Sequence, residues 1–163
     1  MRKFAIIAFV SAAAGCTPPM EVTQPKVTAG IVSTVDRQRL SSYTDMTVRA
    51  YNARGEKPAE LRGVPCTVRS EQISVDVTTP VTIAVPRFVQ SGRFDQRGRP
   101  AQLLVSCEAN GMRGAASVDA EDKQVSTATN AGLAGAILTT AVTAAMAGST
   151  PWKFPAAVNV NMR

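Results

Sequence analysis

Hydrophobic and polar positions alternate along much of the chain. In residues 44–51, Met46, Val48 and Ala50 fall on one face of an extended strand, and Thr47, Arg49 and Tyr51 fall on the other. Such alternation, rich in β-branched residues, predicts half-buried strands. The same signs predict strands at residues 27–35, 44–51, 64–68, 73–77, 81–85, 103–107, 115–118 and 158–162. Turn signals between them favour a mainly β fold, a small antiparallel β-sandwich or barrel.

Two loops interrupt this pattern. Residues 52–63 mix acidic and basic side chains with Gly and Pro, which is typical of a solvated connection. Residues 86–100 are more strongly biased and interleave two phenylalanines with a candidate anionic-surface patch, namely Arg87, Arg93, Arg97 and Arg99. Such a loop could hold anionic head groups, glycan or an acidic protein partner. The alternative is an ordinary hairpin loop that tucks Phe88 and Phe94 into the core.

Residues 126–150 form an apolar segment that lacks charged residues and is rich in Ala, Gly and Thr. Small side chains recur every four residues at Gly132, Ala136, Thr140, Ala144 and Gly148. On a helix this spacing forms a stripe that permits close backbone approach. The favoured interpretation is one C-terminal Ala/Gly-rich helix that packs against the sandwich before the final strand. The alternatives are a membrane-inserting or homo-oligomerising helix over 130–148, and a mobile connection, because Gly and Thr weaken helix propensity.

The N-terminus has the organisation of a secretory signal peptide. Arg2 and Lys3 precede an apolar run of eleven residues, 4–14, which is too short to cross a bilayer as a helix. The run ends in Ala13, Ala14, Gly15 and Cys16, which resembles a bacterial lipobox although Ala13 replaces the usual large aliphatic residue. We therefore expect residues 1–15 to be removed and Cys16 to be acylated. Ordinary cleavage after Ala14 would instead release a soluble protein.

The cysteine count agrees with lipidation. The chain has three cysteines, and an odd thiol is unfavourable in an oxidising compartment. Lipidation of Cys16 would leave Cys66 and Cys107 to form a disulfide, which would restrict the unfolded chain by about 4 kcal/mol in the entropic model. Two separate buried thiols are the alternative.

Residues 16–26 contain three prolines and no apolar periodicity, and so predict an extended tether that holds the domain about 30 Å from the membrane. Residues 27–163 then fit a single domain. Loss of Arg2 and Lys3 lowers the formal charge from +6 to +4, a modest balance that favours anionic partners over neutral ones. An exported protein gives no reason to expect nucleic acid as a partner.

The residues favour no catalytic mechanism. The chain has no histidine, which removes Ser-His-Asp and Cys-His catalysis and the commonest neutral-pH metal ligand. There is no phosphate-binding loop. The nearest candidates for an acidic pair, Asp119, Glu121 and Asp122, fall in a polar stretch that is typical of a solvated turn. We expect neither an enzyme, a metal site nor a cofactor.

Several short motifs resemble a loosely defined group of bacterial envelope lipoproteins built on a PEGA-like, immunoglobulin-like β-sandwich. They lie at residues 63–68, 79–86, 103–107 and 154–162, and the resemblance covers roughly residues 60–163. It implies a sandwich fold, an envelope location and a disulfide. Most members have no known biochemical function, and their domains resemble surface or interaction modules, so the resemblance brings no catalytic residues.

Together these features predict a non-catalytic, lipid-anchored binding or scaffolding module that faces the periplasm. Thr17, rather than Asp, follows the lipidated cysteine, which favours the outer over the inner membrane. Envelope proteins and anionic head groups are the expected partners. The alternative is a membrane-inserting or self-assembling protein that acts through residues 130–148.

Overall fold

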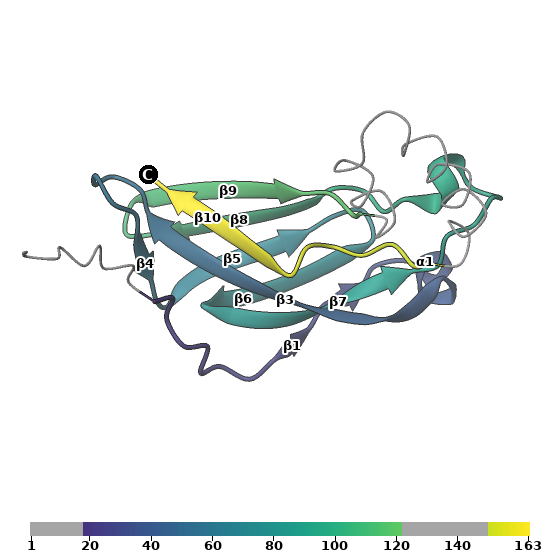
Figure 1. The fold of residues 1–163 in the computed structure, drawn as a ribbon, viewed down its shortest axis with the longest axis horizontal. Coiled ribbons are helices and arrows are strands. Elements are labelled where there is room, and N and C mark those ends of the chain that lie inside the picture. Colours follow the sequence, from purple (N-terminus) through teal and green to yellow (C-terminus); the bar gives the residue numbers. More distant parts are fainter. Residues whose placement is uncertain (1–17, 122–149) are drawn as a thin grey trace, which may run out of the picture.

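The computed structural model describes residues 18–121 and 150–163. These residues form ten strands, one α-helix and one 3-10 helix (Figure 1). In chain order the elements are β1 (Val27–Thr28), β2 (Gly30–Ile31), α1 (Thr34–Gln38), β3 (Leu40–Asn52), β4 (Ala59–Leu61), β5 (Val64–Arg69), β6 (Ile73–Thr79), β7 (Val81–Phe88), η1 (Asp95–Gly98), β8 (Leu103–Ala109), β9 (Met112–Val118) and β10 (Ala157–Met162).

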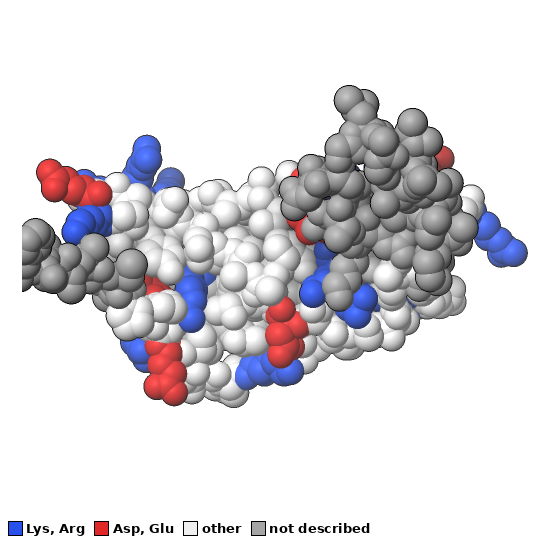
Figure 2. All heavy atoms as spheres, viewed as in Figure 1, with Lys and Arg blue, Asp and Glu red and all other residues white. Residues whose placement is uncertain are grey.

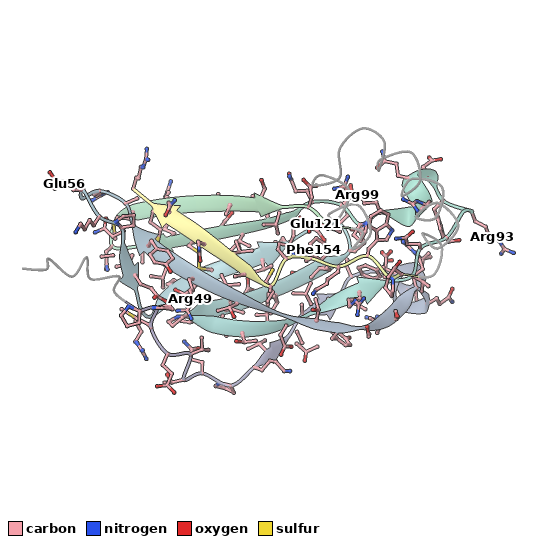
Figure 3. All side chains as sticks on the ribbon, viewed as in Figure 1. Arg49, Glu56, Arg93, Arg99, Glu121 and Phe154 are labelled. Carbon is pink, nitrogen blue, oxygen red and sulfur yellow. A yellow bond between two sulfur atoms is a disulfide. The ribbon has the colours of Figure 1, made fainter. Side chains whose placement is uncertain are left out.

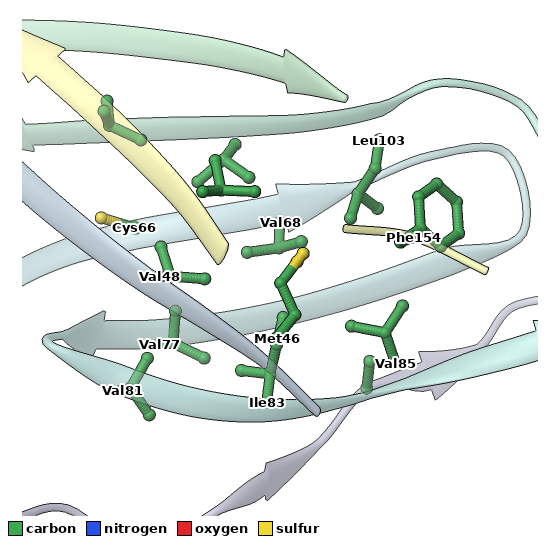
Figure 4. Packing of buried hydrophobic residues seen from close by; sticks show 14 of the residues in the cluster. Met46, Val48, Cys66, Val68, Val77, Val81, Ile83, Val85, Leu103 and Phe154 are labelled. Carbon is green, nitrogen blue, oxygen red and sulfur yellow. The ribbon is translucent and has the colours of Figure 1, made fainter. Parts of the chain in front are cut away.

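The strands form two sheets that enclose one core, so the prediction of a small, mainly β sandwich is confirmed. One sheet has the order β1-β7-β3-β10, with β4 pairing with the end of β3, and the other has the order β2-β6-β5-β8-β9. The predicted alternation in β3 is also confirmed, because Met46, Val48 and Ala50 are fully buried. Figure 4 shows Met46 and Val48 packed against aliphatic side chains of the opposite sheet, including Val68 and Val77.

The prediction of a wholly antiparallel sandwich is wrong for one sheet. The β2-β6-β5-β8-β9 sheet is antiparallel throughout, whereas β1 pairs with β7 and β10 pairs with β3 in parallel. Parallel neighbours need a long connection instead of a tight hairpin. Strand β10 has such a connection, because strands β4 to β9 lie between it and β3 in the sequence.

The single strand predicted over 27–35 is also wrong. The chain changes sheets at Ala29, which is 1% exposed: β1 lies in one sheet and β2 in the other. Ser33 then ends the extended stretch, because its hydroxyl accepts a hydrogen bond from the Asp36 N–H (3.1 Å) and caps α1. The loop expected at residues 52–63 contains the short strand β4.

The two sheets are joined along one side. Arg113 on β9 and Arg163, just after β10, exchange two backbone hydrogen bonds of 3.0 Å. Gly114 lies at this junction, where a β-carbon would meet the carbonyl oxygen of Asn161 on β10. Glycine is therefore required here by the close approach of two backbones.

The expected free tether is not found at residues 20–24. The backbone of Met20 is hydrogen-bonded by Glu60 and Arg49, and Gln24 donates to the carbonyl of Thr78 (2.9 Å). This segment lies along the domain and enters it beside β4, at one end of the molecule (Figure 1).

Other predictions concern residues outside the described ranges. They are the signal peptide 1–15, the lipidation of Cys16, and the apolar segment 126–150 with its proposed oligomerising stretch 130–148, of which only Thr150 is described. Within the part of the chain that is described, no helix has the length and apolar character needed to cross a membrane.

Candidate functional site

The described chain begins with residue 18 at one end of the sandwich, and the predicted arginine patch lies at the opposite end. Figure 3 shows Arg93 at this end and Glu56 at the other. Arg93 and Arg97 are exposed in the loop between β7 and β8. Arg87 is half-buried on β7, opposite Ser42 of β3. Arg99 donates to the carbonyl of Ala120 (3.1 Å) and pairs with Asp119 (3.5 Å). The structure therefore exposes Arg93, Arg97 and Arg99, and Arg99 also attaches the loop to the segment after β9.

Arg39, at the end of α1, is the arginine that holds this loop, and the sequence did not single it out. Its guanidinium lies 4.8 Å from the ring centroid of Phe94 and 5.7 Å from that of Phe88, within the range of cation–π contacts. It also donates to the carbonyl of Gly98 and pairs with Asp36 (3.4 Å). No local signal connects Arg39 with Gly98, because 59 residues separate them.

The backbone of the loop has an unusual conformation that its contacts maintain. Gln96, Arg97 and Gly98 have φ angles of 49°, 56° and 68°, a left-handed region that disfavours side-chain-bearing residues. The carbonyls of these three residues accept hydrogen bonds from four donors. Gln96 accepts from the Arg99 N–H (3.2 Å), and Arg97 accepts from the Ser91 N–H (3.1 Å) and the Trp152 indole (3.2 Å). With the Arg39 bond to Gly98, these contacts fix the loop in place.

The two phenylalanines of the loop differ in role. Phe88 is fully buried at the end of β7, as the hairpin alternative expected, whereas Phe94 is 44% exposed. Val89 is 40% exposed, and its N–H donates to the carbonyl of Arg39 (2.9 Å). We call the exposed side chains of Val89, Arg93, Phe94 and Arg97 the arginine–phenylalanine surface. It combines positive charge with apolar area, as binding surfaces commonly do.

Unpaired polar groups lie near this surface. Gln90 is 7% exposed, and neither atom of its side-chain amide has a hydrogen-bond partner among the described residues. The hydroxyl of Thr150 is also buried without one. Both residues lie two positions from the antiparallel bridge between Phe88 and Trp152. Buried polar groups without partners are uncommon in proteins, and these two lie at the same end of the sandwich as the arginine–phenylalanine surface.

A groove of about 940 Å³ crosses the outer face of the other sheet, where small side chains such as Thr67, Ser106 and Ala115 line it. The four charged residues along it form two ion pairs, Arg69 with Asp76 (3.8 Å) and Arg113 with Glu108 (2.9 Å). Because these charges are matched within the protein, the groove has no net charge with which to select a ligand.

The disulfide between Cys66 and Cys107 lies beneath this groove, between the directly opposed positions of β5 and β8. The prediction of this pair is therefore confirmed, and the alternative of two separate thiols is wrong. Both residues are 3% exposed and belong to the core. Within residues 18–121 and 150–163, no group of three or more acidic, cysteine or histidine side chains could hold a metal ion.

Comparisons with known proteins give no family for the chain: no family model matches it, and no curated protein or solved structure is significantly similar to it. The PEGA-like resemblance therefore stays a prediction from the sequence motifs.

Proposed function

We propose that the protein is a non-catalytic lipoprotein of the bacterial envelope, anchored through acylated Cys16, that uses the arginine–phenylalanine surface to bind an acidic envelope protein. The observation that carries this proposal is the exposure of Arg93 beside Phe94 on a loop whose backbone carbonyls accept hydrogen bonds from Arg39 and Trp152. A preordered loop loses little entropy on binding. Arginine and aromatic side chains, phenylalanine included, are also enriched at protein–protein interfaces relative to the rest of the surface.

The position of the surface supports a protein partner over the head groups of the anchoring membrane. The described chain begins at residue 18, only two residues after Cys16, and enters the domain at the end opposite Arg93 (Figures 1 and 3). An anchor at Cys16 would therefore direct the arginine–phenylalanine surface away from its own membrane. The absence of histidine from the chain supports a non-catalytic role.

The binding proposal can be tested by photo-crosslinking in intact cells. A photoreactive residue at position 92 leaves Arg93 and Phe94 unchanged, and no atom lies within 4 Å of the β-carbon position of Gly92. The same residue at position 104 is the control, because Leu104 is 47% exposed on the outer face of the other sheet. We expect a protein adduct at position 92 that Arg93→Ser with Phe94→Ser lowers about tenfold and that Arg69→Ser leaves unchanged. A lipid adduct, or equal protein adducts at both positions, would overturn the binding proposal.

The anchor is tested separately by labelling cells with palmitate. The wild-type chain should incorporate the label and sediment with outer-membrane fractions, whereas Cys16→Ser should do neither. Absence of label from the wild-type chain would overturn the lipoprotein assignment.

A further inference from the structure

Arg49 and Glu60 hold the backbone of Met20 from both sides. The Met20 N–H donates to Oε2 of Glu60 (2.7 Å), and the Met20 carbonyl accepts from Nη1 of Arg49 (2.7 Å). Arg49 also pairs with Oε1 of Glu60, and the two side chains are only 15% and 7% exposed. We call this arrangement the N-terminal clamp. It satisfies both backbone groups of Met20, as pairing with a further strand would.

The residues after the clamp are attached as well. Arg62 donates to the carbonyl of Glu21 (3.3 Å) and to the hydroxyl of Thr23 (3.2 Å). Further along, Lys26 pairs with Asp45 on β3 (3.1 Å). Residues 20–26 are therefore held along the domain from β4 to β3 and do not act as a spacer.

This attachment limits how far the domain can stand from a lipid on Cys16. Only four residue steps separate Cys16 from Met20, and a fully extended chain of that length spans at most about 14 Å. The tether expected from the prolines would have allowed about 30 Å. The clamp lies beside β4, so the end of the molecule that contains the loop 53–63 would be the end nearest the lipid.

The loop at this end is exposed and carries a positive balance. Arg54, Lys57 and Arg62 are exposed, and Glu56 is the exposed acid among residues 53–63. Figure 2 shows both basic and acidic side chains at this end of the molecule. Arg54 donates to the carbonyl of Gly111 (3.2 Å), so the loop is braced against the turn between β8 and β9. Basic side chains held close to a membrane are attracted by anionic head groups.

We propose that the N-terminal clamp seats the 53–63 end of the domain on the surface of the membrane that carries the Cys16 lipid, with Arg54 and Lys57 at anionic head groups. This inference rests on the proposed anchor. It also gives the domain a fixed orientation, in which the arginine–phenylalanine surface points away from the anchoring membrane.

The experiment compares two spin labels on the lipidated full-length product in vesicles of phosphatidylglycerol and a nickel-chelating lipid. Glu56→Cys labels the clamp end without removing a basic residue, and Arg93→Cys labels the opposite end. Acylation of Cys16 and the Cys66–Cys107 disulfide leave the new thiol as the one that reacts. We expect nickel to relax the label at position 56 strongly and the label at position 93 little. Equal relaxation at both positions in acylated protein would overturn the inference and leave the anchor intact.

Two further variants, each with its own control, test the cause of the orientation. Arg49→Met should remove the hydrogen bond to the Met20 carbonyl and the partner of Glu60, and so should reduce the difference between the labels, whereas Arg69→Met, which changes an exposed pair elsewhere, should preserve it. Arg54→Gln with Lys57→Gln should reduce the difference, and Arg37→Gln at the opposite end should not. If Arg49→Met impairs folding, the wild-type label pair still decides the inference. Protein that is not acylated and does not sediment with vesicles would instead contradict the proposed function itself.

Discussion

Arg113 and Arg163 exchange two backbone hydrogen bonds of 3.0 Å, and these bonds join the edge of one sheet to the edge of the other. Such a junction brings the two backbones close together, so little space is left for a side chain between them. Gly114 is the residue at which this limit is reached, because its added β-carbon would meet the carbonyl of Asn161.

Gly114→Ala should therefore lower the free energy of unfolding by about 1–3 kcal/mol, the usual effect of an overpacked contact that the backbone cannot relieve. Urea unfolding followed by the fluorescence of Trp152, the only tryptophan, measures the change. Gly92→Ala is the matched control, since nothing lies within 4 Å of its β-carbon position, and its effect should stay within about 0.5 kcal/mol. Equal effects of the two substitutions would contradict the close approach at Gly114.

Replacing Cys66 and Cys107 together with Ser should lower the free energy of unfolding by about 4 kcal/mol, because their bond closes a loop across 41 residues of the unfolded chain. In the denatured, unreduced protein neither cysteine should react with a thiol reagent, and both should react after reduction. A Cys66 or Cys107 thiol that reacts before reduction would refute the disulfide.

Glu60→Ala should lower the free energy of unfolding by about 3–5 kcal/mol, since it leaves the largely buried charge of Arg49 without its partner. Hydrogen exchange at the amide of Met20 should become faster at the same time, because that amide donates to Glu60.

Asp76→Ala is the control for this prediction. Asp76 pairs with Arg69, but the two side chains are 72% and 63% exposed, so the loss should stay below about 1 kcal/mol. A Glu60→Ala variant no less stable than Asp76→Ala would show that the clamp contributes little.

Arg39→Ala should loosen the loop that contains η1. The substitution removes a charged hydrogen bond to the Gly98 carbonyl, an interaction usually worth about 1.5–3 kcal/mol, so the open form should become about tenfold or more populated. Limited proteolysis with trypsin measures this, because cleavage after Arg93 and Arg97 follows the open population. Arg37→Ala is the control: the Arg37 side chain donates a long 3.4 Å bond to the carbonyl of Ile31, and its loss should leave the cleavage rate unchanged.

Local patterns accounted for the strands but not for the contacts between distant segments. The burial of Met46, Val48 and Ala50 follows from alternation that is visible in eight residues of sequence. The change of sheet at Ala29 is not visible in the same way, because two-residue strands such as β1 and β2 carry no alternation that shows which sheet they join.

In the candidate site, too, local patterns identified some residues, whereas residues that depend on contacts between distant segments were missed. Four loop arginines could be identified by composition, and three of them, Arg93, Arg97 and Arg99, are exposed. Arg39 could not be found, because its stacking on Phe94 and its bond to Gly98 arise only when α1 and the loop meet in the fold. Glu60 was assigned to a solvated loop for a similar reason: its burial depends on Arg49 and on Met20, 40 residues earlier.

The position of β10 affects how the protein reaches its native state. Val158, Val160 and Met162 on β10 complete the core beside β3, which lies more than one hundred residues earlier in the sequence. Pairing over such a sequence separation slows folding, because the chain must close a long loop before the contacts form. The core of the sandwich therefore stays incomplete until β10 has been synthesised and has paired with β3.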